Sequence, residues 1–147
     1  MSYMNNDLFL IDSNILIYSI DSSDKVKHLK AKNILRECWI GKKTYAISLQ
    51  NLSEFFVIST SKVEKPISKE KSARIIKGLI EFNGFIKLEP STETIKKALD
   101  IAIKEKRSYW DSLIIAIMNQ NNISHIFTED VSGFNIPGIN AINPFSK

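Results

Sequence analysis

The sequence has few of the residues that mark several common protein classes. Cysteine occurs once, at Cys38, so no disulfide can form within the chain and nothing indicates an oxidising compartment. No apolar run approaches the roughly 18 residues that would suggest a membrane span. No basic stretch precedes an apolar core at the N-terminus, as a signal peptide would require. We therefore expect a cytoplasmic protein with no membrane association.

Glycine and histidine are also scarce, and their placement narrows the chemistry. The five glycines never form a GxGxxG pattern, and "IDSNIL", residues 11–16, contains none. A dinucleotide-binding domain needs a glycine-rich turn after its first strand, so that class is excluded. The only histidines are His28 and His125, with no evident acid–base pairing between them. This argues against a histidine ribonuclease, which would use the 2′ hydroxyl of RNA as its nucleophile.

What remains is an ordinary globular composition with a small excess of positive charge. The 147 residues are 44% hydrophobic and 24% charged, which is typical of one folded domain spanning residues 1–147. The formal net charge of +4 favours an anionic partner, although many basic proteins bind no nucleic acid.

Short apolar runs alternate with longer stretches of helical period. The predicted strands cover residues 8–11, 45–47, 85–88, 125–127 and 140–142. The predicted helices cover residues 14–20, 25–39, 49–61, 68–82, 92–105 and 109–120. N-cap positions are occupied by Ser48, Ser68, Ser91 and Ser108. Strands separated by helices imply right-handed crossovers, so we expect a three-layer α/β/α sandwich with a mainly parallel central sheet.

Four acids lie where sites form in such sheets, outside the carboxyl ends of the strands. Asp12 follows the first predicted strand, Glu54 lies in the helix after the second, and Asp130 follows the run 125–127. Asp111 stands in the first turn of an apolar helix. Each acid alone has an ordinary explanation as a helix cap, a first-turn acid, a surface glutamate or a turn residue. Their shared position at one edge favours a common role.

Carboxylates gathered at one edge need a counter-charge. Two of them about 4 Å apart repel by about 4 kcal/mol at an effective dielectric near 20, and burial raises their pKa values further. Hard oxygen ligands without a cysteine or histidine cluster suit Mg²⁺ or Mn²⁺ and argue against zinc. Two such ions would neutralise four carboxylates and suit in-line displacement at a phosphodiester. We expect one or two ions, with the same four acids as metal ligands and catalytic residues: Asp12, Glu54, Asp111 and Asp130.

Five segments carry a family resemblance. They are "LIDSNILIYSID", "ISLQNLSEFFVISTSK", "YWDSLIIAIM", "IFTEDVSGF" and "INPF". In this order and spacing the chain resembles a PIN-domain protein of the VapC toxin type over nearly its whole length. The resemblance implies a Mg²⁺- or Mn²⁺-dependent ribonuclease whose four acids line one pocket. By motif matching these are the four acids above, and the pattern favours Asp130 over the adjacent Glu129 as the last of them.

Three polar residues match family positions beside the acids. Ser13 stands where many members have threonine, Asn14 is the usual asparagine, and Thr128 supplies the hydroxyl ahead of the last acid. Such groups orient metal waters or a phosphate. The alternative is that Ser13 or Asn14 caps the helix that starts near Ile15. The four-acid layout implies hydrolysis by a metal-activated water, which leaves 5′ phosphate and 3′ hydroxyl ends.

The resemblance also implies partners, and other functions stay open. Proteins of this type usually act as toxins held in check by a small antitoxin, and they commonly form homodimers. One alternative is an RNA-processing PIN nuclease without a toxin role. Another is a doubly wound phosphatase or phosphotransfer domain with Asp12 as nucleophile, although Asn14 stands where that class has its second aspartate. A third is an RNA-binding or scaffold protein that keeps the fold without catalysis.

Overall fold

The computed structural model describes residues 8–146, in which five parallel strands form one sheet. The strand order is β3-β2-β1-β4-β5. The strands are β1 (Phe9–Ile11), β2 (Tyr45–Ser48), β3 (Phe85–Leu88), β4 (His125–Phe127) and β5 (Asn140–Ile142). Residues 1–7 lie outside the described residues. The expectation about a signal peptide concerns mainly these residues. The predicted strands agree with these bounds to within one residue at each end.

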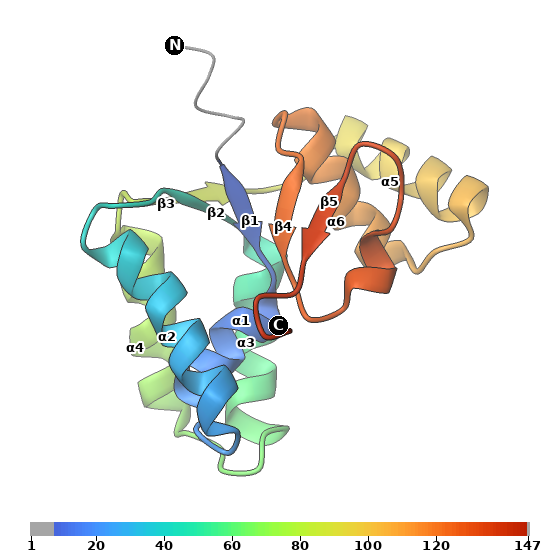
Figure 1. Ribbon diagram of the computed structural model, residues 1–147. Helices are drawn as coiled ribbons and strands as arrows, with labels where there is room; N and C mark the ends of the chain where they lie inside the picture. Colours follow the sequence, from blue (N-terminus) through green and yellow to red (C-terminus); the bar gives the residue numbers. More distant parts are fainter. Residues whose placement is uncertain (1–7, 147) are drawn as a thin grey trace.

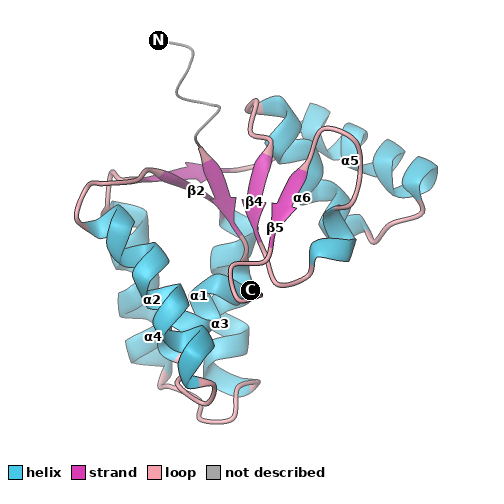
Figure 2. Cartoon of the chain, viewed as in Figure 1, coloured by secondary structure: helices cyan, strands magenta, loops and turns pink. Residues whose placement is uncertain are grey.

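Helices connect the strands and cover both faces of the sheet (Figures 1 and 2). They are α1 (Ser13–Ile20), α2 (Lys25–Trp39), α3 (Leu49–Ser61), α4 (Lys69–Glu81), α5 (Thr92–Glu105), α6 (Tyr109–Gln120) and the short 3₁₀ helix η2 (Val131–Phe134). In Figure 1, α1 to α4 gather on one side, and α5 and α6 lie on the other. The predicted three-layer α/β/α architecture is therefore confirmed.

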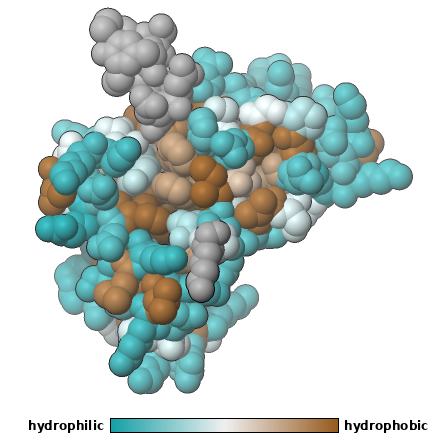
Figure 3. Space-filling model, viewed as in Figure 1, coloured by the Kyte–Doolittle hydropathy of each residue, from teal (hydrophilic) through white to brown (hydrophobic). Residues whose placement is uncertain are grey.

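Side chains of the central strand β1 alternate between the two faces of the sheet, and both faces are therefore covered by helices. Leu10 and Ile11 are both fully buried, but they belong to different hydrophobic clusters. Ile11 packs with side chains of α1 to α4, whereas Leu10 packs with Ile115 and Met118 of α6. Successive side chains of a strand point to opposite faces, so β1 joins two cores. In Figure 3 hydrophobic residues show mainly in the middle of one face, and hydrophilic residues cover the helices at its margins.

The predicted serine caps all begin helices. Ser48, Ser68, Ser91 and Ser108 each accept a hydrogen bond from a backbone N–H in the first turn of the following helix. The N-cap of α1 is Asp12, which confirms the helix-cap role considered for that acid, and α1 begins at Ser13, one residue before the predicted start. Asp12 Oδ1 accepts from the Ser13 N–H at 2.8 Å, so the alternative in which Ser13 or Asn14 caps this helix is wrong.

The parallel arrangement brings the carboxyl ends of the strands to one edge. Leu10 of β1 pairs with Ala46 of β2 and with Ile126 of β4. The residues that follow these three strands, among them Asp12 and Thr128, are therefore neighbours despite their distance along the chain. Among residues 8–146, no helix is both long and apolar enough to cross a bilayer.

Candidate active site

Asp12 lies at the centre of this edge, between β1 and α1. Besides the Ser13 N–H, its carboxylate accepts from Thr128 Oγ1 at 2.7 Å and from Asn51 Nδ2 at 3.2 Å. Burial is the main cause that raises the pKa of Asp12, the hydrogen bonds from Thr128 and Ser13 act against it, and the nearby charges of Glu54 and Asp130 raise the pKa further. Asp12 is thus a desolvated carboxylate among other acids.

Asn51 connects Asp12 to Glu54. Its Nδ2 donates to Glu54 Oε1 at 3.3 Å as well as to Asp12. Its Oδ1 accepts from Ser48 Oγ at 2.9 Å, so the residue that caps α3 also orients the amide. Asn51 is buried and was not among the predicted site residues. Its signal in the sequence is its place one turn before Glu54, where the two side chains share a helix face.

Glu54 is half-buried and has a solvent-exposed neighbour on its own helix. Val57, which follows Glu54 by three residues on α3, is 50% exposed. The helix therefore does have a solvated side next to the glutamate. The opposite face of α3 carries the buried Leu52 and Phe55 into the core.

Asp111 and Asp130 meet over Gly133 of η2. A Cβ atom built on Gly133 would lie 2.6 Å from Asp111 Oδ2 and 2.9 Å from Asp130 Oδ2, so both carboxylates converge on the space that this glycine leaves. Burial raises the pKa of Asp111, and the charges of Asp130 and Asp12 act in the same direction. Asp111 is held in place from its own helix, because its N–H donates to the cap Ser108. Gly133 was not predicted, and no signal in the single sequence distinguishes it from an ordinary turn glycine.

The loop after β4 carries the remaining predicted residues. Thr128 Oγ1 donates to Asp12, accepts from the Asp130 N–H at 3.0 Å, and lies 3.4 Å from Asn14 Nδ2. Asn14 Oδ1 in turn accepts from the Glu129 N–H at 3.2 Å. Thr128 and Asn14 therefore link α1 to this loop, whereas Ser13 contributes its backbone N–H to Asp12. The Glu129 carboxylate faces away from the four acids, toward Tyr18 and Lys27.

The donor set fits a hard divalent cation. All four acids offer carboxylate oxygens. Burial is the main cause that raises the pKa values of Asp12 and Asp111, neighbouring carboxylates raise them further, and a cation would relieve that repulsion. Within residues 8–146, no three Asp, Glu, His or Cys side chains already lie at the spacing of ligands to a single ion. Instead, Asn51 donates to both Asp12 and Glu54, and Thr128 donates to Asp12.

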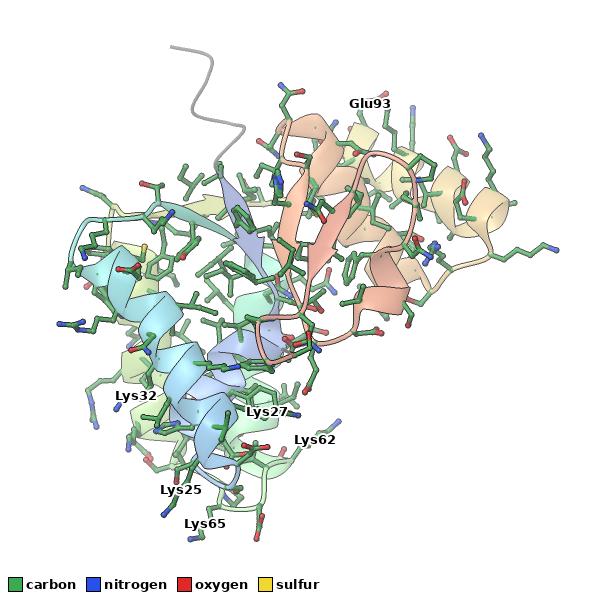
Figure 4. All side chains as sticks on the ribbon, in the orientation of Figure 1. Lys25, Lys27, Lys32, Lys62, Lys65 and Glu93 are labelled. Atoms are coloured by element: carbon green, nitrogen blue, oxygen red, sulfur yellow. The ribbon has the colours of Figure 1, made fainter. Side chains whose placement is uncertain are left out.

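Positive charge and an apolar cavity are found on the lobe formed by α1 to α4. Lys25, Lys27, Lys32, Lys62 and Lys65 lie on the lobe of α1 to α4 (Figure 4). A cavity of about 630 Å³ opens among the same helices, and its lining includes Leu16, Leu29 and Phe55 but none of the four acids. The region that could bind an apolar group is thus separate from the acids.

Comparison with known families defines the class of this fold and site. The PIN domain family matches residues 9–135, and the chain belongs to that family. No curated protein matches the chain.

Solved structures with the same fold include several toxins. A toxin–antitoxin complex from Klebsiella pneumoniae is 21% identical, with a TM-score of 0.62, and the match covers 92% of this chain and 97% of that chain. Mycobacterium tuberculosis VapC20, a sarcin–ricin loop cleaving toxin, is 14% identical with a TM-score of 0.66, covering 89% and 98%. VapBC2 from Rickettsia felis, bound to a promoter DNA fragment, is 18% identical with a TM-score of 0.64, covering 92% and 98%.

Proposed function

We propose that this protein is a Mg²⁺- or Mn²⁺-dependent endoribonuclease that acts as the toxin of a toxin–antitoxin pair. The observation that carries the proposal is the arrangement of Asp12, Glu54, Asp111 and Asp130 around one edge of the sheet, where Asn51 joins Asp12 to Glu54 and Asp111 meets Asp130 over Gly133. PIN family membership supports the same reading.

Each residue has a definite task in this proposal. Asp12 and Glu54, joined by Asn51, form one half of the ligand set, and Asp111 and Asp130, which meet over Gly133, form the other. Bound Mg²⁺ or Mn²⁺ would supply Lewis-acid activation of a water and neutralise charge on the phosphate. Thr128 keeps one oxygen of Asp12 in a fixed direction, and Asn14 holds the loop that presents Thr128.

Cleavage of RNA tests the enzymatic part of the proposal. We expect the purified chain to cut RNA with Mg²⁺ or Mn²⁺, to stop when a chelator is added, and to lose activity in Asp12→Ala. The products should carry 5′ phosphate and 3′ hydroxyl ends. Cyclic 2′,3′-phosphate ends would eliminate the metal mechanism, and cleavage that survives the chelator would do the same.

The toxin role rests on the structural neighbours, which include toxin–antitoxin complexes. The apolar cavity among α1 to α4 suits an antitoxin segment: Leu29 at the cavity is 60% exposed, and Lys32, Arg36 and Arg74 in its lining favour acidic side chains on the partner. We also propose a homodimer, which light scattering after gel filtration would test.

Growth on expression separates a toxin from a general RNA-processing nuclease. We expect growth arrest that Glu54→Ala or Asp111→Ala relieves, and relief by co-expression of a small protein encoded next to this one. Undisturbed growth with soluble, active enzyme would favour the RNA-processing alternative. The phosphotransfer alternative is less favourable, because Asn14 stands where that class has its second aspartate, and its amide is engaged with Thr128 and the Glu129 N–H. A trapped aspartyl phosphate on Asp12 would revive it.

A further inference from the structure

Glu129 stands between two residues of the candidate active site but faces the other way. Thr128, on one side, donates to Asp12, and Asp130, on the other, meets Asp111 over Gly133. The Glu129 carboxylate instead accepts from Tyr18 Oη at 2.8 Å and forms an ion pair with Lys27 Nζ. A single residue therefore connects the acid-bearing loop to the ends of both α1 and α2.

Lys27 is itself held by aromatic rings. Its ammonium lies 5.1 Å from the centroid of the Tyr18 ring and 6.0 Å from that of Phe145, and its Nζ lies 3.4 Å from Tyr18 Oη. The two rings pack edge to face with centroids 5.0 Å apart. Lys27 and Glu129 are each only 31% exposed. Cation–π contacts and partial burial make this ion pair more specific in geometry than an open surface pair.

The opposite end of the same loop has a second attachment. The Arg107 guanidinium donates to the Ser132 carbonyl at 2.8 Å and also to the carbonyl of Asn135. Between these anchors lie Asp130 and Gly133, whose relative position decides whether the Asp130 and Asp111 carboxylates converge. Asp130 itself is exposed and receives only a short-range hydrogen bond from Ser132 Oγ, at 3.0 Å. Its placement therefore depends on the path of the loop backbone.

We propose that Glu129 is a positioning residue: its contacts with Lys27 and Tyr18 hold the loop so that Thr128 reaches Asp12 and Asp130 reaches Asp111. This inference rests on the proposed ribonuclease function for its kinetic consequences. Glu129 does not bind the ions or the substrate in this scheme. Removing its contacts loosens two acids at once, so the effect falls on metal affinity and on turnover rather than on RNA binding.

The test compares Glu129→Ala, Glu129→Gln and Lys27→Met with the wild-type protein. Glutamine keeps an oxygen for Tyr18 but loses the charge. Glu93→Ala is the matched control, because Glu93 forms an exposed i,i+3 pair with Lys96 on α5, on the far side of the sheet from Lys27 (Figure 4). Thermal unfolding verifies that each variant is folded. Two assays follow. Electron paramagnetic resonance of the free ion measures the Mn²⁺ affinity, and RNA cleavage measures kcat and KM.

We expect Glu129→Ala to weaken Mn²⁺ binding and lower kcat by about tenfold or more, with KM changed much less. Glu129→Gln should lose less than alanine, and the double variant Glu129→Gln/Lys27→Met should lose no more than the worse single variant, because the two residues act as a unit. Glu93→Ala should match the wild type.

The proposal is overturned if Glu129→Ala keeps wild-type Mn²⁺ affinity and kcat. It is also overturned if only KM rises, since Lys27 and Glu129 would then act on RNA binding. If the wild-type protein cleaves no RNA, the ribonuclease proposal fails, and the Mn²⁺ titration alone decides the role of Glu129.

Discussion

Gly133→Ala is the most discriminating single change in this structure, because it adds one methyl group where two carboxylates converge. The new Cβ would lie 2.6 Å from Asp111 Oδ2, 2.9 Å from Asp130 Oδ2 and 3.2 Å from Asp111 Cγ. The backbone at Gly133 does not lie in the left-handed region, so alanine itself fits the chain conformation there. The perturbation is therefore confined to the acids.

The size of the effect follows from these distances. Ordinary van der Waals contact begins at 3.4 Å, so Asp111 Oδ2 must retreat from 2.6 Å by about 0.8 Å, and Asp130 Oδ2 from 2.9 Å by about 0.5 Å. Metal ligands tolerate only about 0.2 Å, and a displacement near 1 Å costs about 100-fold in rate. We expect kcat to fall about 100-fold and Mn²⁺ binding to weaken by at least about tenfold.

The fold should survive, because replacing glycine with alanine at a compatible site stabilises a protein by about 0.4–1 kcal/mol. The assay is Mn²⁺-dependent RNA cleavage beside a calorimetric Mn²⁺ titration and a thermal melt. The control is Gly78→Ala, which makes the same chemical change inside α4, where a Cβ would meet no atom within 4 Å. Wild-type activity in Gly133→Ala would refute the argument that Asp111 and Asp130 act together over this glycine.

Three other changes have defined outcomes. Asn51→Ala removes the shared donor of Asp12 and Glu54 and should lower the stability of the metal-free protein by about 1–3 kcal/mol. Added Mn²⁺ should raise the melting temperature more in the variant than in the wild type, which a thermal melt would show. Thr128→Val removes a hydrogen bond that lowers the pKa of Asp12, so the pH at half-maximal Mn²⁺ binding should move upward; an unchanged midpoint contradicts this. The raised pKa of Asp12 makes the folded protein bind its proton more tightly, so stability falls as pH rises from 3.8 through the folded pKa and stays low above it. Asp12→Asn should therefore raise metal-free stability at neutral pH and weaken its dependence on pH, and a destabilised variant would contradict the sign.

Local signals in the sequence determined the elements of the fold. The helix caps Ser48, Ser68, Ser91 and Ser108 were predicted correctly, as were the helices 25–39, 49–61, 92–105 and 109–120. Capping and apolar periodicity involve residues close together in the chain, so a single sequence carries them. The start of α1 was predicted one residue late, whereas the helix-cap role considered for Asp12 is confirmed.

The sequence predicted where the acids lie in the fold, because strand order along the chain places Asp12 and Asp130 at carboxyl ends and Asp111 at the start of a buried helix. Their role as metal ligands stays a prediction. Tertiary structure decided which neighbours surround them. Asn51 bridges Asp12 to Glu54, and Gly133 leaves room for two carboxylates. Neither contact has a local signature strong enough to be predicted.

Glu129 and Asp130 also show what the sequence and the tertiary structure each determine. These adjacent acids have different partners: Glu129 contacts Tyr18 and Lys27, and Asp130 converges with Asp111. The family pattern favoured Asp130, but the order of the two residues along the chain carries no physical reason for that preference. The choice follows from Tyr18 and Lys27, more than 100 positions away in sequence, which hold Glu129 on the far side of the loop. The places of the acids after strands, together with the family pattern, predicted an acidic edge from the sequence. Contacts between distant residues, which only folding brings within hydrogen-bond reach, decided how the carboxylates are held there.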